Sequence, residues 1–382
     1  MKNNSLLALT ASALALPGFS TNINADTPPI NTSLEYKLTS YKEGNLPKQE
    51  LLAGSAERYD ITVHQFSINA PIKNEYGLTF TTTYESMSGA SPWYAIDAGE
   101  GNPGIVMSGA TIHEERRDFN LLLRKYDPLG SISVSLGNSN ENDYKSFSGG
   151  FDVVRNFNNE MTTLTAGLSR STDDLSPTDY LLFSRIETAS KSSTSAFVSV
   201  AQIINPTSFF QSSINYTAVK GYLSDPYKLA DSRPSSRRQF IFTNSYRKFL
   251  VKSDSAISID MSLYNDDFDI NSFTLDFSWH KNINRSIKIT PRIRYYSQSN
   301  ADFYTKYNDF SGKNIFSSSD YRLSAFGAIS TIVHAEWDVG DISYNVTAER
   351  YISDEKYSLF NGPANPATVN FKRFSMGFGY KY

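Results

Sequence analysis

The sequence predicts an all-β fold: a transmembrane antiparallel up-and-down β-barrel of about sixteen strands. Three observations predict it. Long segments alternate apolar and polar residues, short turns alternate with long polar loops, and the chain starts with an apolar export-type segment and ends on an aromatic residue. Fourteen to sixteen strands fit the pattern, with short periplasmic turns and long extracellular loops.

Residues 271–298 show the alternation most clearly. Phe273, Leu275, Phe277 and Trp279 occupy every second position, with polar residues between them. After a turn at residues 282–285, the apolar positions of the next segment alternate with Lys288, Thr290, Arg292 and Arg294. Both segments exceed the roughly 5–6 residues of strands in soluble proteins and match the roughly 9–11 residues of a transmembrane strand. Residues 271–298 are therefore predicted to form a membrane-spanning hairpin.

The composition supports a barrel and excludes several classes of function. The chain has 382 residues, a formal charge of −3, 14% aromatic residues and no cysteine. The absence of net basic charge argues against nucleic-acid binding, and the absence of cysteine excludes disulfides, thiolate metal sites and cysteine nucleophiles. Abundant aromatic residues in a chain of negative mean hydropathy, −0.39, suit an aromatic girdle around a polar lumen.

The N-terminus is typical of a secretory signal peptide. Lys2 supplies a positive start, residues 6–16 form a short apolar core, and Ala25 is a small residue at a plausible cleavage site. We therefore predict a signal peptide at residues 1–25, a short periplasmic lead at 26–32 and a barrel domain at 33–382. Export together with amphipathic strands predicts the outer membrane of a Gram-negative bacterium.

Turn and loop signals alternate along residues 33–382. The brief turns lie near residues 71–74, 127–130, 156–160, 205–208, 251–254, 283–285 and 339–341. The longer polar loops lie near residues 44–57, 88–113, 139–145, 172–191, 221–236, 265–270, 299–320 and 353–368. An even strand number places both termini in the periplasm. The first strand, 33–42, and the run 322–337 are ambiguous.

The last strand, residues 371–382, carries aromatic residues at alternate positions and ends on one. Phe378, Tyr380 and Tyr382 resemble the C-terminal signal read by the outer-membrane assembly machinery. The implied partners are outer-membrane lipid, lipopolysaccharide and the barrel-assembly machinery.

Several blocks occur in the order of a known family. They are Ser88-Gly89-Ala90-Ser91-Pro92, Glu115-Arg116-Arg117, Asp143-Tyr144-Lys145-Ser146, residues 221–228, residues 233–238, residues 290–298, Asp302-Phe303-Tyr304 and Tyr321-Arg322-Leu323-Ser324. In this order they resemble the domain of unknown function family 3570, whose members are predicted outer-membrane barrels of Gram-negative bacteria. The resemblance covers nearly all of residues 33–382 except the first strand, and it implies a location and a fold without implying an activity.

Catalytic and metal-binding motifs are weak. The histidines at 64, 113, 280 and 334 do not form a zinc-binding H-E-x-x-H pair. His280 shares its strand face with Ser278 and Asp276. Such residues are about ten times more often ordinary polar residues that line a water-filled lumen than a catalytic group. Residues 265–269 are rich in carboxylates but lack the glycine and closing glutamate of a calcium loop. We predict no catalytic residue, no cofactor and no metal, and hence no enzyme.

Charged residues form the main candidate site. Side chains alternate between the two faces of a strand, and we call this alternation strand parity. Strand parity places six charged residues on the lumen wall as constriction candidates: Lys288, Arg292, Arg294, Arg237, Asp276 and Asp260. Further candidates at the loop rim are Arg116, Arg117, Asp225, Lys228, Arg233, Arg238 and Asp302. Facing charges in a pore sort solutes by charge, whereas charges at a rim also bridge loops without selecting anything.

Three functions remain open at the level of sequence. The first is a porin-like or transporter-like channel for small polar solutes, with a weak preference for anions. The second is a structural or assembly-partner barrel with a plugged lumen. The third, less favoured, is an outer-membrane hydrolase acting on lipid or surface polymer.

Overall fold

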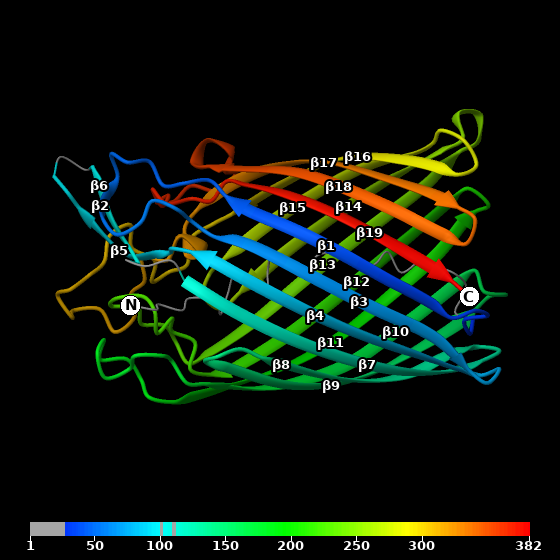
Figure 1. Cartoon of the computed structure of the whole chain (residues 1–382), viewed down its shortest axis with the longest axis horizontal. Coiled ribbons are helices and arrows are strands. Elements are labelled where there is room, and N and C mark those ends of the chain that lie inside the picture. Colours follow the sequence, from blue (N-terminus) through cyan, green and yellow to red (C-terminus); the bar gives the residue numbers. More distant parts are fainter. Residues whose placement is uncertain (1–26, 100–101, 109–111) are drawn as a thin grey trace.

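The computed structural model describes residues 27–99, 102–108 and 112–382. Within them the chain forms one closed antiparallel barrel of sixteen strands, ordered β1-β19-β18-β17-β16-β15-β14-β13-β12-β11-β10-β9-β8-β7-β4-β3 (Figure 1). A three-stranded sheet, β2-β6-β5, lies outside the barrel wall. None of the helices in the described part is long and apolar enough to span a membrane. The predicted signal peptide lies outside the described residues.

The barrel strands are long, as the alternation predicts. They are β1 (Ser33–Glu43), β3 (Asp60–Ile72), β4 (Tyr76–Gly89), β7 (Ile112–Asp127), β8 (Gly130–Asn140), β9 (Tyr144–Phe157), β10 (Thr162–Leu175), β11 (Ala189–Asn205), β12 (Ser208–Gly221), β13 (Ser236–Leu250), β14 (Ser255–Asp266), β15 (Asn271–Asn282), β16 (Ile287–Gln298), β17 (Phe326–Val339), β18 (Ile342–Asp354) and β19 (Phe371–Lys381). The small sheet contains β2 (Leu51–Ala53), β5 (Pro92–Asp97) and β6 (Pro103–Met107), and single helical turns occur at η1 (Val251–Ser253), η2 (Tyr321–Leu323) and η3 (Glu355–Tyr357).

Alternate residues face outward and inward around the wall. Leu275, Phe277 and Trp279 on β15 are each 40–42% exposed, whereas Asp276 and Ser278 between them are buried. This is the parity expected when successive side chains of a strand point to opposite faces. The hairpin at residues 271–298 is therefore confirmed, with its apolar face outward.

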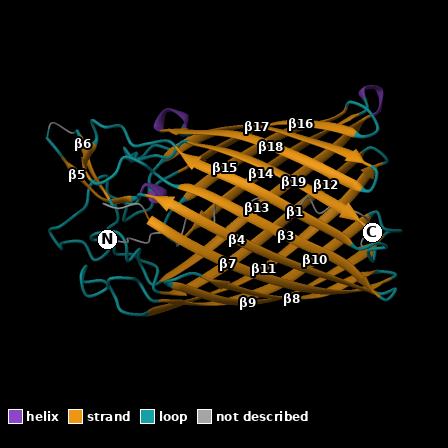
Figure 2. Cartoon of the chain, in the orientation of Figure 1, coloured by secondary structure: helices purple, strands orange, loops and turns teal. Residues whose placement is uncertain are grey.

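The two ends of the barrel differ, as predicted. Seven short turns, at residues 73–75, 128–129, 158–161, 206–207, 251–254, 283–286 and 340–341, join strands at the turn end. The longer connections gather at the opposite, loop end (Figure 2). All seven predicted turns coincide with these connections.

The two ambiguous segments are resolved. Strand β1 pairs with β19, with Ser33 opposite Lys381, and with β3, with Ser33 opposite Asn69, so it closes the barrel. The run 322–337 is not one strand, because residues 321–323 form η2 and β17 starts only at Phe326. Closure leaves no unpaired edge, so the backbone groups of the wall are satisfied without water.

The loops of the loop end pack together into a layer that we call the cap: the described residues of 44–59, 90–108, 222–235, 299–325 and 355–370. One buried apolar group joins three of these loops through Leu46, Ala95, Ile105 and Ala367. A second group joins Ala301 and Leu323 to Phe268 and Ile270 of the β14–β15 connection. The cap therefore has its own packed core.

Candidate functional site

The inward faces of β15 and β16 hold an arginine cluster formed by Asp276, Arg292 and Arg294. Asp276 is 3% exposed and accepts hydrogen bonds from both arginines. Arg292 Nε lies 2.7 and 2.8 Å from the two carboxylate oxygens, and Arg294 Nε lies 2.9 Å from Oδ2. Charge-assisted bonds of this length are strong. One carboxylate thus holds two guanidinium groups, and the arginine cluster keeps one excess positive charge.

The other predicted lumen residues also face inward, and each has a partner. Lys288 forms an ion pair with Glu336 of β17. Arg247 Nη1 lies 2.9 Å from Asp260 Oδ1. These pairs reduce the charge on the wall without removing its polarity.

Sequence reasoning missed part of this wall. Arg373 Nη2 lies 2.5 Å from Glu349 Oε2, across the register pair of β19 and β18. His334 bonds to Glu336 at 2.8 Å and to Thr347 at 2.8 Å. All of these residues lie on the polar parity of their strands, which is a signal in the sequence, but parity does not reveal which residue stands opposite which.

A cavity of about 660 Å³ adjoins these residues on the inner face of β15–β19 and β1. Its charged lining comprises five cationic residues and three acidic ones: Lys37, Lys288, Arg292, Arg373 and Lys381 against Glu35, Glu336 and Asp338. Uncharged polar side chains, including Ser278 and Thr290, complete much of the lining. A polar space with an excess of positive side chains suits small polar or anionic solutes.

The strand opposite the arginine cluster, β8, has only small inward residues. Strand β8 is eight places from β16 in the sixteen-strand order. Its outward residues include Val134 and Leu136, so its inward face consists of Ser131, Ser133, Ser135, Gly137 and Ser139. These side chains are too short to cross the lumen.

His280 faces the lumen, but it does not form a triad with Ser278 and Asp276. Its Nε2 lies 3.0 Å from Ser258 Oγ and its Nδ1 lies 3.2 Å from Thr290 Oγ1. Asp276 is held by the two arginines instead. Catalysis of the Ser-His-Asp kind needs the carboxylate to orient the imidazole, and these residues lack that arrangement.

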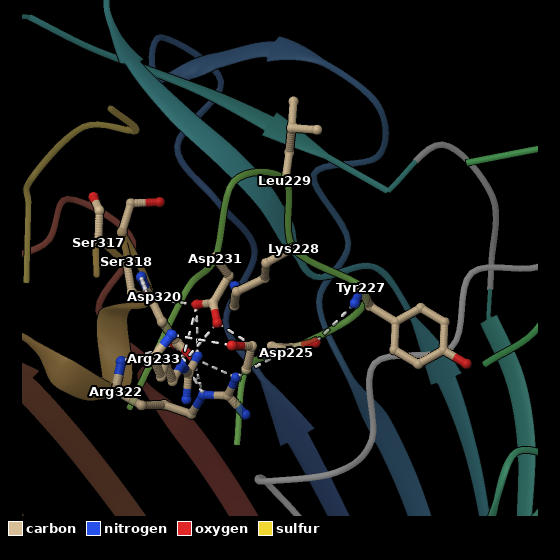
Figure 3. Close-up of polar contacts among 12 residues, drawn as sticks. Asp225, Tyr227, Lys228, Leu229, Asp231, Arg233, Ser317, Ser318, Asp320 and Arg322 are labelled. Carbon is tan, nitrogen blue, oxygen red and sulfur yellow. Dashed lines mark hydrogen bonds and ion pairs between the residues drawn. The ribbon is translucent and has the colours of Figure 1, made fainter. Parts of the chain in front are cut away.

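Above the lumen, three acidic and three basic residues form the cap cluster: Asp225, Lys228, Asp231, Arg233, Asp320 and Arg322. Asp320 is 0% exposed and receives Arg322 Nε at 2.8 Å and Arg233 Nη2 at 2.8 Å. Arg233 also binds Asp231, and Arg322 also binds Asp225 at 2.8 Å. Figure 3 shows both arginines converging on these carboxylates, whereas the ring of Tyr227 points away.

Electrostatics keep Asp320 ionised despite its burial. Burial alone would raise the pKa of Asp320, but the charges of Arg322, Lys228 and Arg233 hold it well below its usual range. Burial lowers the pKa of Lys228, and Asp320 opposes that effect. Charges removed from water are tolerated only when they are paired in this way.

The cap cluster crosses the mouth of the barrel. The loop at residues 222–235 follows β12, and β12 and β13 are ninth and eighth in the order that begins with β1. Lys228 nevertheless donates to the carbonyl oxygen of Pro92, in the β4–β7 connection, at 2.8 Å. The ring of Tyr321 lies 5.9 Å from Lys228 Nζ and 5.1 Å from the guanidinium of Arg58, which precedes β3. The loop therefore reaches from one side of the barrel to the other.

The remaining rim candidates are dispersed. Arg237, which was predicted as a lumen residue, faces inward and bonds to Asp266 at the base of the cap. Arg117 pairs with Glu115 on the outer surface, Arg238 pairs with Asp267 at 70% side-chain exposure, and Asp302 is exposed. The structure brings only Asp225, Lys228 and Arg233 of the rim candidates together.

Arg116 lies among buried carboxylates below the cap. Its Nε lies 3.7 Å from Glu141 and its Nη1 lies 3.9 Å from Glu85. Burial, followed by the carboxylates of Asp143, Glu114 and Glu85, outweighs Arg116 and raises the pKa of Glu141 to about 8. Glu141 is therefore a proton-binding group at neutral pH.

The acidic loop at residues 265–269 uses its oxygens internally. Asp266 Oδ1 accepts from the backbone nitrogens of Phe268 and Ile270, each at 3.0 Å. In the described part of the chain, no group of three or more His or acidic residues is placed to hold a metal ion.

The chain belongs to the family described as "Protein of unknown function (DUF3570)", whose model matches residues 6–371. No curated protein matches it significantly. Among solved structures it is similar to a bacterial polysaccharide outer membrane secretin, with 8% identity, a TM-score of 0.53, and coverage of 94% of this chain and 100% of the other. It is also similar to CdiB from Acinetobacter baumannii, with 8% identity, a TM-score of 0.52, and coverage of 91% of this chain and 60% of the other. Identities this low show the fold alone, which is that of outer-membrane barrels.

Proposed function

We propose that this DUF3570 barrel is a gated, transporter-like channel for small polar solutes in the outer membrane of a Gram-negative bacterium, with the cap as its gate. The observation that carries the proposal is the polar, incompletely neutralised lumen beneath a cap whose charged residues span the mouth. Sixteen strands enclose a lumen wide enough for an aqueous passage unless loops block it. The loop end is taken as extracellular, as in other barrels with short periplasmic turns.

The lumen supports a weak preference for anions. The arginine cluster holds two positive charges and one negative charge, and the cavity beside it has more cationic than acidic side chains. Fixed positive charge raises the local concentration of anions in a passage with walls of low dielectric constant. Ion pairing elsewhere on the wall keeps the preference modest.

Reversal potentials in a salt gradient test this preference. Changing Arg292→Ser and Arg294→Ser together converts the cluster from one excess positive charge to one excess negative charge, because Asp276 remains. The parent should favour anions weakly, and the double variant should favour cations. Adding Asp276→Ser should return the selectivity toward neutrality. A parent selective for cations, or a double variant identical to the parent, would mean that these arginines only brace the wall.

Single-channel recording tests the gate. The parent should conduct rarely, and Asp320→Asn, which weakens the cap cluster, should raise the open probability. The matched control is Asp267→Asn, which removes an exposed ion pair with Arg238 outside the cap cluster. Normal heat-modifiable mobility of each variant would establish that the barrel has folded.

The cap also favours a second function. A mouth crossed by ion-paired loops suits a structural or assembly-partner barrel with a plugged lumen. If the parent and a folded Asp320→Asn variant both fail to conduct, the channel proposal fails and the plugged barrel replaces it.

A further inference from the structure

Three cations stand directly opposite one another on the outer surface near the loop end, and we call them the cation row. Lys42 on β1 is opposite Lys372 on β19, and Lys372 is opposite Arg350 on β18. Phe374 and Met376, which share the parity of Lys372 on β19, are each 46% exposed on the outer surface. Figure 1 shows β1 in blue beside β19 in red and β18 in orange.

The cation row has too few acidic partners. Lys42 Nζ lies 3.2 Å from Asp60 Oδ2. Lys372 and Arg350 form no ion pair within the described residues, and Asp354, further along β18, is paired with Lys356 at 3.1 Å. Like charges directly opposite each other destabilise a sheet. The row therefore carries two positive charges that the neighbouring residues do not neutralise.

We propose that the cation row binds the phosphate groups of a phosphorylated glycolipid of the outer leaflet. Arg and Lys side chains grouped at this spacing can share a phosphate through charge-assisted hydrogen bonds. Phe374 and Met376 lie on the turn side of Lys372, where they would contact the acyl chains of the same lipid. The inference rests on the proposed outer-membrane location and is independent of whether the barrel conducts.

The charges and their surroundings favour a lipid over a soluble anion. The row points away from the lumen, toward the surface that meets the membrane, and apolar side chains continue from it along β19. A soluble anion would use only the charges, whereas a lipid uses both features. The row also spans the β1–β19 seam, so a bound headgroup would tie together the two strands that close the barrel.

The test compares two triple variants in neutral detergent. The row variant carries Lys42→Gln, Lys372→Gln and Arg350→Gln. The control variant changes three outward cations on other strands, which stand opposite polar, small or acidic residues: Lys145→Gln, Arg170→Gln and Lys220→Gln. Lys145 stands opposite Asp174, as Lys42 stands opposite Asp60, and each variant loses three positive charges.

The measurement is the temperature at which the folded electrophoretic form is lost, titrated with bisphosphorylated lipid A, dephosphorylated lipid A or inorganic phosphate. Lipid A should stabilise the parent and the control variant, and its half-saturating concentration should rise on the order of tenfold to a hundredfold in the row variant. Without lipid, the row variant should be at least as heat-stable as the parent, because the repulsion is gone.

Three outcomes would overturn the proposal. Equal losses of lipid A binding in both variants would indicate general surface charge. Stabilisation by inorganic phosphate or dephosphorylated lipid A equal to that by lipid A would indicate that the row does not recognise a phosphorylated lipid. A row variant less stable than the parent without lipid would indicate that the cations brace the sheet through contacts of their own.

Discussion

Replacing Arg322 by Gln should open the cap, and the chain offers a direct way to measure it. The sequence has no cysteine, so a single thiol reports on one place. Ala301 is 0% exposed in the core of the cap and hydrogen bonds to Leu323 next to Arg322. In an Ala301→Cys background, the rate of thiol labelling measures how often the cap opens.

The magnitude follows from the partners of Arg322. It binds Asp320, which is fully buried, and Asp225. Removing one partner of a buried ion pair costs about 3–5 kcal/mol, and because Arg233 still holds Asp320 we take the lower value, about 3 kcal/mol. Since each 1.4 kcal/mol is a factor of ten, labelling should accelerate roughly a hundredfold.

The control is Arg238→Gln in the same background. Arg238 is 70% exposed at the side chain and pairs with Asp267. A surface pair contributes about 0–1 kcal/mol, so labelling should change less than about fivefold. If Arg322→Gln and Arg238→Gln accelerate labelling equally, or if neither does, the cap cluster does not hold the cap closed and the gate must be sought elsewhere.

Three further predictions concern the wall, its closure and the response to pH. Phe277→Arg places a charge at an outward position that is 42% exposed and should lower the free energy of unfolding in lipid by about 2–4 kcal/mol. Ser278→Arg places the charge in the cavity and should lower it less. Unfolding of both variants in bilayers measures the difference, and equal losses would refute the assigned register. Deleting Tyr380–Tyr382 removes the end of β19, which pairs with β1. The truncated chain should show no heat-modifiable mobility in outer-membrane fractions, because the wall would have an unpaired edge in lipid. Normal insertion would argue against closure of the barrel at this strand. The raised pKa of Glu141, about 8 against 4.5, means that the folded state binds a proton more tightly than the unfolded state, so the stability should fall as the pH rises from about 4.5 to 8. The melting temperature of Glu141→Gln should match that of the parent near pH 5 and exceed it above about pH 8. A difference in melting temperature that does not change with pH would disprove the assignment.

The strands of the barrel wall and their two faces could be predicted because both depend on residues that are close together in the sequence. Alternation along residues 273–279 gives the faces of β15, and turn residues such as those at 251–254 give the ends of the strands. Membrane strands follow these rules closely because every backbone group must be paired and every outward side chain must meet lipid. The first strand was harder to assign because its pairing with β19 joins residues 328 to 348 positions apart in sequence.

The partners of charged residues could not be predicted in the same way. Parity placed Asp276 and Arg294 on one face, but their direct opposition depends on the register of the hairpin. The contact of Asp320 with Arg233 depends on two loops meeting across the mouth, and no local pattern encodes it. The sequence thus predicted which residues face the lumen or the rim, but not which of them form ion pairs.

The charge balance of the three clusters changes with their surroundings. The cap cluster, which is mostly buried, has three acidic and three basic residues. The arginine cluster, at the lumen wall, has one carboxylate for two arginines. The cation row, on the outer surface, has one acidic partner for three cations. Buried charge must be neutralised within the protein, because the cost of removing an unpaired ion from water is several kcal/mol. At a lumen wall, water and passing ions can stabilise part of the unpaired charge. In a charged row that faces the membrane surface, lipid phosphates can neutralise the charge. The excess of positive over negative side chains is therefore largest where an external partner of opposite charge is available.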